Sequence, residues 1–174
     1  MMDAAAATSS LTSALKGFKL QASESMDVVD KLTAIDLKAA TSAGEIATGL
    51  AQFANVGSLA GVTLDEAAAY VATIADVTQM GGSSAGQALK TIISRYGNVK
   101  AGAYNQLTFD ADTSDGTQVN DVERVLNKLG ISIRSSNLEF KSFSDVLDEI
   151  AERWDTLDTV SKKAIANAFA GVRQ

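Results

Sequence analysis

The sequence contains no cysteine and no histidine. Without cysteine there is no disulfide bridge and no thiolate zinc site, and without histidine most transition-metal sites lose their usual ligand. Nucleophile and base systems that depend on either residue are excluded as well. These absences favour a structural or interaction protein over an enzyme. We therefore assign no catalytic residue, no cofactor-binding residue and no metal ligand.

Proline is also absent and aromatic residues make up only 6% of the chain, whereas alanine is abundant. This composition favours closely packed helices over a sandwich or barrel, whose turns usually need proline. With 174 residues, 46% of them hydrophobic, the chain can bury one core or form two small subdomains. The predicted class is all-α, with about seven to eight short stacked helices and one small β-hairpin near 131–140.

Basic residues are outnumbered, and the net charge is −6. Binding along a nucleic-acid backbone depends on clustered Lys and Arg that release counterions, so direct nucleic-acid binding is not expected. The N-terminal residues Met1–Ala7 lack the basic and long apolar regions of a secretory signal, and no export is implied.

A helix-start pattern recurs three times at an offset of 21 residues. Each copy has a hydroxyl residue followed three positions later by Glu or Gln, as in a capping box. The three pairs are Ser42 and Glu45, Thr63 and Glu66, and Ser84 and Gln87. Gly61 and Gly82 precede the second and third caps, where a left-handed residue would end the previous helix.

Apolar residues recur at helical spacing after each of these caps. The three stripes are Ile46, Leu50 and Phe53; Ala67, Val71 and Ile74; and Leu89, Ile92 and Tyr96. Leu50, Val71 and Ile92 occupy equivalent places. We predict three stacked helices. Either an internal duplication or ordinary helix and loop lengths can explain the spacing.

The chain is predicted to divide into a helical stack over 1–97, a polar loop over 98–118 and a second part over 119–174. Two helices are expected upstream of Ser42, one with Leu11, Leu15 and Phe18, and one with Val28, Leu32 and Ile35 that begins near Ser23. One compact domain overall remains the alternative.

The second part begins with a helix that contains Val122, Val125, Leu126 and Leu129 and ends at Gly130. Alternation at Ile131 and Ile133, and again at Leu138 and Phe140, predicts the hairpin, with its turn at 135–137. Two further helices carry Phe143, Val146, Leu147, Ile150, Trp154 and Leu157, and Val160, Ala164, Ile165 and Phe169. Trp154 is the only tryptophan, and its spacing predicts a place in the core.

Three local patterns suggest chemistry, and each has a simpler interpretation. The segment 110–121 resembles a calcium-binding loop, but Gly116 falls one position late and Asp121 replaces the usual final Glu, which favours a polar surface loop. Ser13 and Lys16 have the spacing of a Ser–Lys nucleophile pair without the accompanying motifs. The uncharged segment 46–64 contains Gly57 and Gly61 at the spacing of packed membrane helices, but its polar residues and helix-stop signals favour a packed soluble pair.

Four stretches resemble the core region of phage tail tape measure proteins. They are LTSALKGFKLQASESMDVVDKL, GVTLDEAAAYVATIADVTQMGGSSAGQALKTIISR, VLNKLGIS, and VLDEIAERWDTLDTVSKKAIANAFAGVRQ. The Gly-x-x-Leu-Lys-Thr, Leu-Gly-Ile and Ala-Gly-x-Arg-Gln elements occur in the family's order. The polar segment 98–118 is longer than the resemblance implies, and Asn137 stands where glycine is common.

The resemblance implies a structural module of a longer phage or prophage minor tail protein that acts in tail assembly, length determination and genome delivery. It implies the tail tube lumen as location, after assembly in the host bacterial cytoplasm. The implied partners are tail tube, tail-tip and tail-assembly chaperone proteins, and self-association is an open alternative. Membrane contact is not expected for this segment. Abundant carboxylates leave a peptidoglycan hydrolase as one alternative function, and segment 46–64 leaves a membrane-perturbing module as another.

Overall fold

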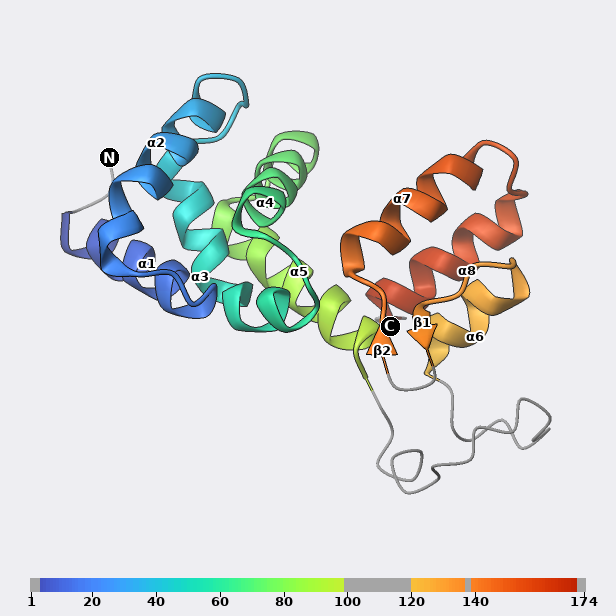
Figure 1. Ribbon diagram of the computed structural model, residues 1–174. Coiled ribbons are helices and arrows are strands. Elements are labelled where there is room, and N and C mark those ends of the chain that lie inside the picture. The colour runs from blue at the N-terminus through green and yellow to red at the C-terminus, as the bar shows by residue number, and fades with distance from the viewer. Residues whose placement is uncertain (1–3, 99–119, 137–138, 172–174) are drawn as a thin grey trace. The chain divides into compact units, whose positions relative to one another are not determined.

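The computed structural model describes residues 4–98, 120–136 and 139–171, and the chain forms two compact units, Met1–Lys90 and Thr91–Gln174. Within the described ranges it contains eight α-helices and one two-stranded antiparallel hairpin (Figure 1). The prediction of an all-α fold with one small hairpin is confirmed. The predicted polar loop over 98–118 lies outside the described residues except for residue 98. The segment 110–121, which resembles a calcium-binding loop, also lies outside them except for its last two residues.

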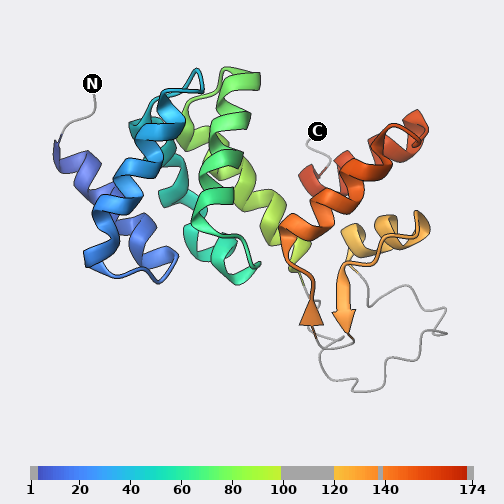
Figure 2. The same ribbon diagram turned by 45° about the horizontal axis from the view of Figure 1, so that its top comes forward.

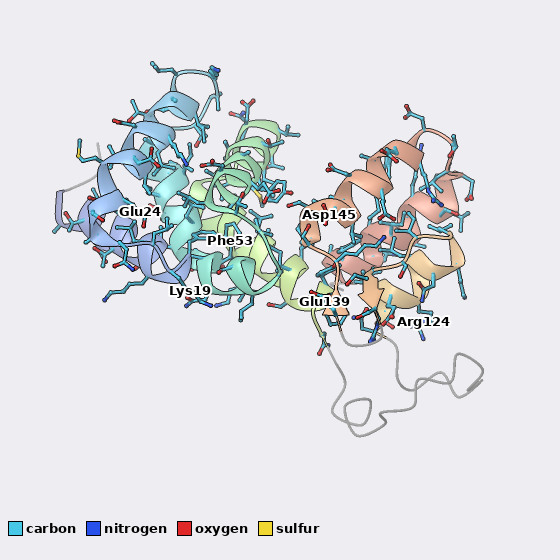
Figure 3. The ribbon with its side chains drawn as sticks, in the orientation of Figure 1. Lys19, Glu24, Phe53, Arg124, Glu139 and Asp145 are labelled. Atoms are coloured by element: carbon cyan, nitrogen blue, oxygen red, sulfur yellow. The ribbon has the colours of Figure 1, made fainter. Side chains whose placement is uncertain are left out.

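The first unit is built from helices that pack around α3. Its elements are α1 (Ala4–Gly17), the short 3-10 helix η1 (Ala22–Glu24), α2 (Ser25–Asp36), α3 (Ala43–Leu59), α4 (Leu64–Thr78) and the first part of α5 (Gly82–Tyr96). Helix α3 contacts α1, α2 and α4. Its predicted stripe of Ile46, Leu50 and Phe53 is buried, and Phe53 lies inside the unit (Figure 3).

Two of the three predicted helix starts are confirmed. The Ser42 hydroxyl oxygen accepts from the Glu45 N–H at 3.2 Å and begins α3. The Thr63 oxygen accepts from the Glu66 N–H at 3.3 Å, while the Glu66 carboxylate accepts from the Thr63 N–H at 2.8 Å, so α4 begins with a complete capping box. Gly61 is left-handed, with φ 76°, as predicted for a residue between two helices.

The third predicted start, at Ser84, is wrong. Helix α5 already begins at Gly82, and the Ser84 N–H donates to the Gly81 carbonyl at 3.0 Å. Gly82 therefore does not end α4, whose C-terminal left-handed residue is Gln79, with φ 56°. The cap comes from another helix instead, because the Glu45 carboxylate accepts from the Gly82 N–H.

The 21-residue offset consequently holds for α3 and α4 but not for α4 and α5, whose first residues are Leu64 and Gly82. The third stripe also differs from the prediction at its middle position, since Ile93 is buried and Ile92 only half-buried. Leu89 and Tyr96 are buried as predicted. These differences favour a stack of helices of ordinary length over a strict threefold repeat.

The second unit combines the end of α5 with three helices and the hairpin. Its other elements are α6 (Asp121–Lys128), β1 (Arg134–Ser136), β2 (Glu139–Phe140), α7 (Phe143–Trp154) and α8 (Thr159–Ala170). The strands pair Arg134 with Phe140 and Ser136 with Glu139. Gly130 ends α6 with φ 73°, as predicted. Ser135 and Ser136 lie in β1 rather than in the predicted turn, and Asn137 lies outside the described residues.

Two predicted core residues of the second unit face solvent. Trp154 is 38% exposed because α7 ends there, and the Lys162 ammonium lies 5.5 Å from its ring centroid. Val160 is 78% exposed in the first turn of α8. The helical period extended the predicted core into the last turn of α7 and the first turn of α8, where these two side chains are exposed. Phe143, Val146 and Ile165 are buried as expected.

Candidate interaction surfaces

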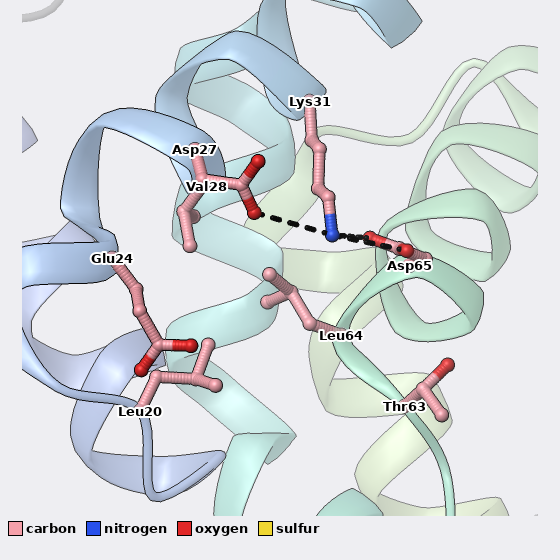
Figure 4. Close-up of a pocket in the computed structure, with 8 residues that line it drawn as sticks. All are labelled: Leu20, Glu24, Asp27, Val28, Lys31, Thr63, Leu64 and Asp65. Atoms are coloured by element: carbon pink, nitrogen blue, oxygen red, sulfur yellow. Dashed lines mark hydrogen bonds and ion pairs between the residues drawn. The ribbon is translucent and has the colours of Figure 1, made fainter.

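A small pocket lies between α2 and α4 in the first unit (Figure 4). It has a volume of ≈ 170 Å³ and is lined by Leu20, Glu24, Asp27, Val28, Lys31, Thr63, Leu64 and Asp65. The Lys31 ammonium lies 3.4 Å from an Asp27 carboxylate oxygen and 3.1 Å from one of Asp65. It therefore joins a neighbour on its own helix to the start of α4.

Lys31 is paired with both Asp27 and Asp65 in this pocket. The hydrogen bond to Asp65 raises the pKa of Lys31, burial opposes this, and Asp27 raises the pKa further. Glu24 accepts from the Gln21 N–H at 2.6 Å. Exposed pairs of this kind add little stability. The Lys31 pairs with Asp27 and Asp65 connect α2 to the start of α4.

A buried ion pair fixes the hairpin of the second unit to α6. The guanidinium of Arg134 donates to both carboxylate oxygens of Glu123, at 2.6 and 2.9 Å. The Glu123 side chain is 8% exposed and that of Arg134 18%. Arg134 also lies 5.1 Å from the ring centroid of Phe140 on the facing strand. Glu123 and Arg134 were missed by sequence analysis, since nothing local links residues eleven positions apart.

Tyr96 and Asn120 form a second buried polar group in this unit. The Tyr96 hydroxyl donates to the Lys141 carbonyl at 2.6 Å, and its ring lies edge-on to Phe143 with centroids 5.4 Å apart. The Asn120 amide donates to the carbonyls of Tyr96 at 3.1 Å and Asn98 at 3.2 Å. The Asn120 oxygen accepts from the Glu123 N–H at 2.7 Å and begins α6.

The Ser13 and Lys16 pattern, which lies within the described residues, does not form a nucleophile pair. Ser13 and Lys16 are both exposed on α1, and the Ser13 hydroxyl donates to the Ser9 carbonyl at 2.9 Å. Among the residues that the structure describes, no group of three acidic side chains could hold a metal ion. No helix within the described ranges is long and apolar enough to cross a membrane.

Both units leave large apolar side chains in solvent. Among the residues that the structure describes, those exposed are Met26, Val29, Leu37, Leu59, Val77, Met80, Trp154 and Val160. Side chains of this size that gather on one face mark sites of protein contact, whereas scattered ones need no explanation. Met26, Val29 and Leu37 all belong to the α2 segment.

Comparison with known proteins identifies the family of this chain. The family model for phage-related minor tail proteins matches residues 1–171, which include nearly all of both units. No solved structure matches the chain. Minor tail proteins are structural components of the virion that contact other tail components. Because the match extends over almost the whole sequence, the chain belongs to the phage-related minor tail protein family.

Proposed function

We propose that the chain is a structural module of a tail tape measure protein, acting in tail assembly and length determination and in genome delivery. The observation that carries this proposal is the family match over residues 1–171. The tape measure role within that family is supported by the ordered Gly-x-x-Leu-Lys-Thr, Leu-Gly-Ile and Ala-Gly-x-Arg-Gln elements. The module has no catalytic role in this proposal.

The glycines of these elements serve the fold. A Cβ on Gly86 would lie 2.8 Å from the carbonyl carbon and the α-carbon of Gly49. Gly130 and Gly171 have φ values of 73° and 78°, which side chains rarely adopt. A Cβ on Gly171 would also meet the guanidinium of Arg95. The elements that carry the resemblance therefore specify backbone geometry, as expected of a structural module.

In this role the module contacts the tail tube, tail-tip proteins or tail-assembly chaperones. It resides in the tube lumen after assembly in the host cytoplasm. A tape measure also requires a long helical body in the same reading frame, and the coding sequence around these residues tests that requirement directly.

The functional test uses the phage that encodes this chain. Gly86→Leu places a large side chain against the α3 backbone, whereas Ser84→Ala changes an exposed position of the same helix. We expect the first variant to yield particles without normal tails in negative-stain electron microscopy and the second to yield normal tails. In-frame lengthening of the helical body should lengthen the tail. Normal tails with Gly86→Leu, or unchanged length after lengthening, contradict the proposal.

The alternatives predict different results with the purified chain. Clearing of a peptidoglycan gel would establish a hydrolase, and dye release from lipid vesicles would establish a membrane-perturbing module. We expect neither activity.

A further inference from the structure

Helices α1 and α2 both pack against α3 in the first unit (Figure 2). Residues of these three helices line an apolar groove. Its volume is ≈ 230 Å³, and its lining is Ala7, Thr8, Leu11, Val29, Leu32, Thr33, Ala43, Gly44 and Ala47. None of these residues is charged. The groove is smaller than the pockets of roughly 300–1,000 Å³ that enclose drug-sized ligands. Its size suits one inserted apolar side chain rather than a small-molecule cofactor.

The groove continues into an exposed stripe on α2. Met26, Val29 and Thr33 of α2 and Leu37, the helical residue that caps its C-terminus, follow one another at intervals of three and four residues, so they lie along one face. Met26 is 68% exposed, Val29 39% and Leu37 84%. We call these four residues the α2 stripe. Val29 and Thr33 belong to both the stripe and the groove lining, which makes the two one continuous surface.

The charge beside this surface is negative. Asp30 is exposed on the same face and has no ion-pair partner among the described residues. The nearest cation on the helix, Lys31, is paired with Asp27 and Asp65 on another side. A second copy that docked α2 against α2 about a twofold axis would place the central Asp30 residues near one another, which is unfavourable. A partner with Lys or Arg at this position is favoured instead.

We propose that the groove and the α2 stripe bind an amphipathic helix of a different protein. One large aliphatic or aromatic side chain of that helix enters the groove, and its neighbours cover Met26 and Leu37. A Lys or Arg at the edge of its apolar face pairs with Asp30. This is helix-in-groove recognition with a charge that selects the partner. The inference depends only on the first unit and not on the tape measure role.

The test uses the full 174-residue chain and two synthetic helical peptides of equal length. Both peptides carry the same leucine face; one has Lys at the flanking positions and the other has Glu. Fluorescence anisotropy measures each affinity. We expect the Lys peptide to bind at least about tenfold more tightly than the Glu peptide, a ratio within the range of charge selection at interfaces.

Two matched variants separate this surface from general attraction to an acidic chain. Val29→Asp places a charge in the groove, and Leu59→Asp places the same charge at an exposed apolar residue of α3 outside the lining. Both variants gain one negative charge, so electrostatic attraction alone would strengthen Lys-peptide binding in both. We expect Val29→Asp to abolish binding and Leu59→Asp to retain it. Circular dichroism checks that both keep the helical fold.

Asp30→Lys changes only a solvent-exposed position and should reverse the preference toward the Glu peptide. Equal binding of the two peptides to the unaltered chain would overturn the proposal. So would equal losses in Val29→Asp and Leu59→Asp, or an unchanged preference in Asp30→Lys. Concentration-dependent dimers in sedimentation velocity that Val29→Asp disperses and Leu59→Asp does not would also overturn it, because a second copy would then be the occupant.

Discussion

Gly86 lies directly against the backbone of Gly49, so α5 and α3 approach without a side chain between them. A Cβ at position 86 would stand 2.8 Å from two backbone carbons of Gly49 and nearer still to its oxygen. One turn earlier, Gly82 lies against Glu45 in the same way. The Glu45 carboxylate also accepts from the Gly82 N–H. The two helices are thus held together by close backbone contact and by the side chain of α3 that caps the N-terminus of α5.

Gly86→Ala should therefore destabilise the first unit. In an exposed helix interior the change would stabilise by about 1 kcal/mol. Here the added methyl forces α5 away from α3, and overpacking of this kind costs about 1–3 kcal/mol. We expect a net loss, read as a lower thermal midpoint by circular dichroism. Ser84→Ala, an exposed change in the same helix, should stay within about 0.5 kcal/mol of the unaltered chain. Equal stability of the two variants would refute the close contact.

Asn120→Asp should destabilise the second unit although Asp is as good a helix cap as Asn. The carboxylate keeps the acceptor for the Glu123 N–H but loses the donor to the carbonyls of Tyr96 and Asn98. Leaving buried acceptors unsatisfied costs about 1–3 kcal/mol. Trp154, the only tryptophan, lies in this unit, and its fluorescence in a urea titration gives the change in unfolding free energy.

Asn120→Ser is the companion variant, because it keeps a capping oxygen without adding a charge. A lower unfolding free energy in both variants assigns the effect to the missing amide donor. A loss with Asp alone would assign it to the buried charge, and stability retained in both would show that the hydrogen bonds contribute nothing measurable.

The Glu123–Arg134 pair should show strong coupling. Glu123→Leu alone leaves a largely buried guanidinium without its carboxylate, and breaking one side of a buried pair costs about 3–5 kcal/mol. Glu123→Leu combined with Arg134→Met should cost clearly less, since the double variant leaves no unpaired charge. Urea unfolding of both single variants and the double variant completes the thermodynamic cycle. Additive losses would mean that the two side chains act independently.

Local signals in the sequence predicted most of the helices. The caps at Ser42 and Thr63 depend on residues three positions apart, and Gly61 and Gly130 mark positions where the backbone itself turns left-handed. The hairpin was found from alternation around Ile133. Each of these features involves neighbours along the chain, so the sequence pattern carries the necessary information.

Features that depend on distant partners could not be predicted. Gly82 was interpreted as a helix stop, yet it is a glycine because α3 passes beside it. Arg134 was not linked with Glu123, and Asn120 was not linked with Asn98, because their contacts form only after folding. Periodicity placed Trp154 in the core, but the side chain is exposed at the last residue of α7, and the sequence pattern did not show that the helix ends there. For the same reason the exposed α2 stripe was not predicted, although the sequence predicted the core stripe of that helix with Val28, Leu32 and Ile35.

Tyr96→Phe should change the response of the second unit to alkaline pH. Burial, followed by the nearby charges of Asp145 and Glu149, raises the pKa of Tyr96 above its ordinary value of 10.0 in the folded protein. The unfolded chain therefore releases this proton first as pH rises. The stabilising contribution is fully present below about pH 10 and is lost as pH rises from there toward the folded-state pKa. Tyr96→Phe removes this loss, so its unfolding free energy should fall less steeply above pH 10.

Near neutral pH the same variant should be less stable by about 1 kcal/mol, because the hydrogen bond from the hydroxyl to the Lys141 carbonyl is gone. Urea titrations followed by Trp154 fluorescence at several pH values measure both effects. The two stability curves should converge as pH increases, since only the unaltered protein has the phenol to ionise. Parallel curves separated by a constant offset would show that the pKa of Tyr96 does not differ between the folded and unfolded chain. Coincident curves would show that Tyr96 contributes through the packing of its ring against Phe143 alone. A curve for Tyr96→Phe that falls more steeply would reverse the sign of the inferred linkage.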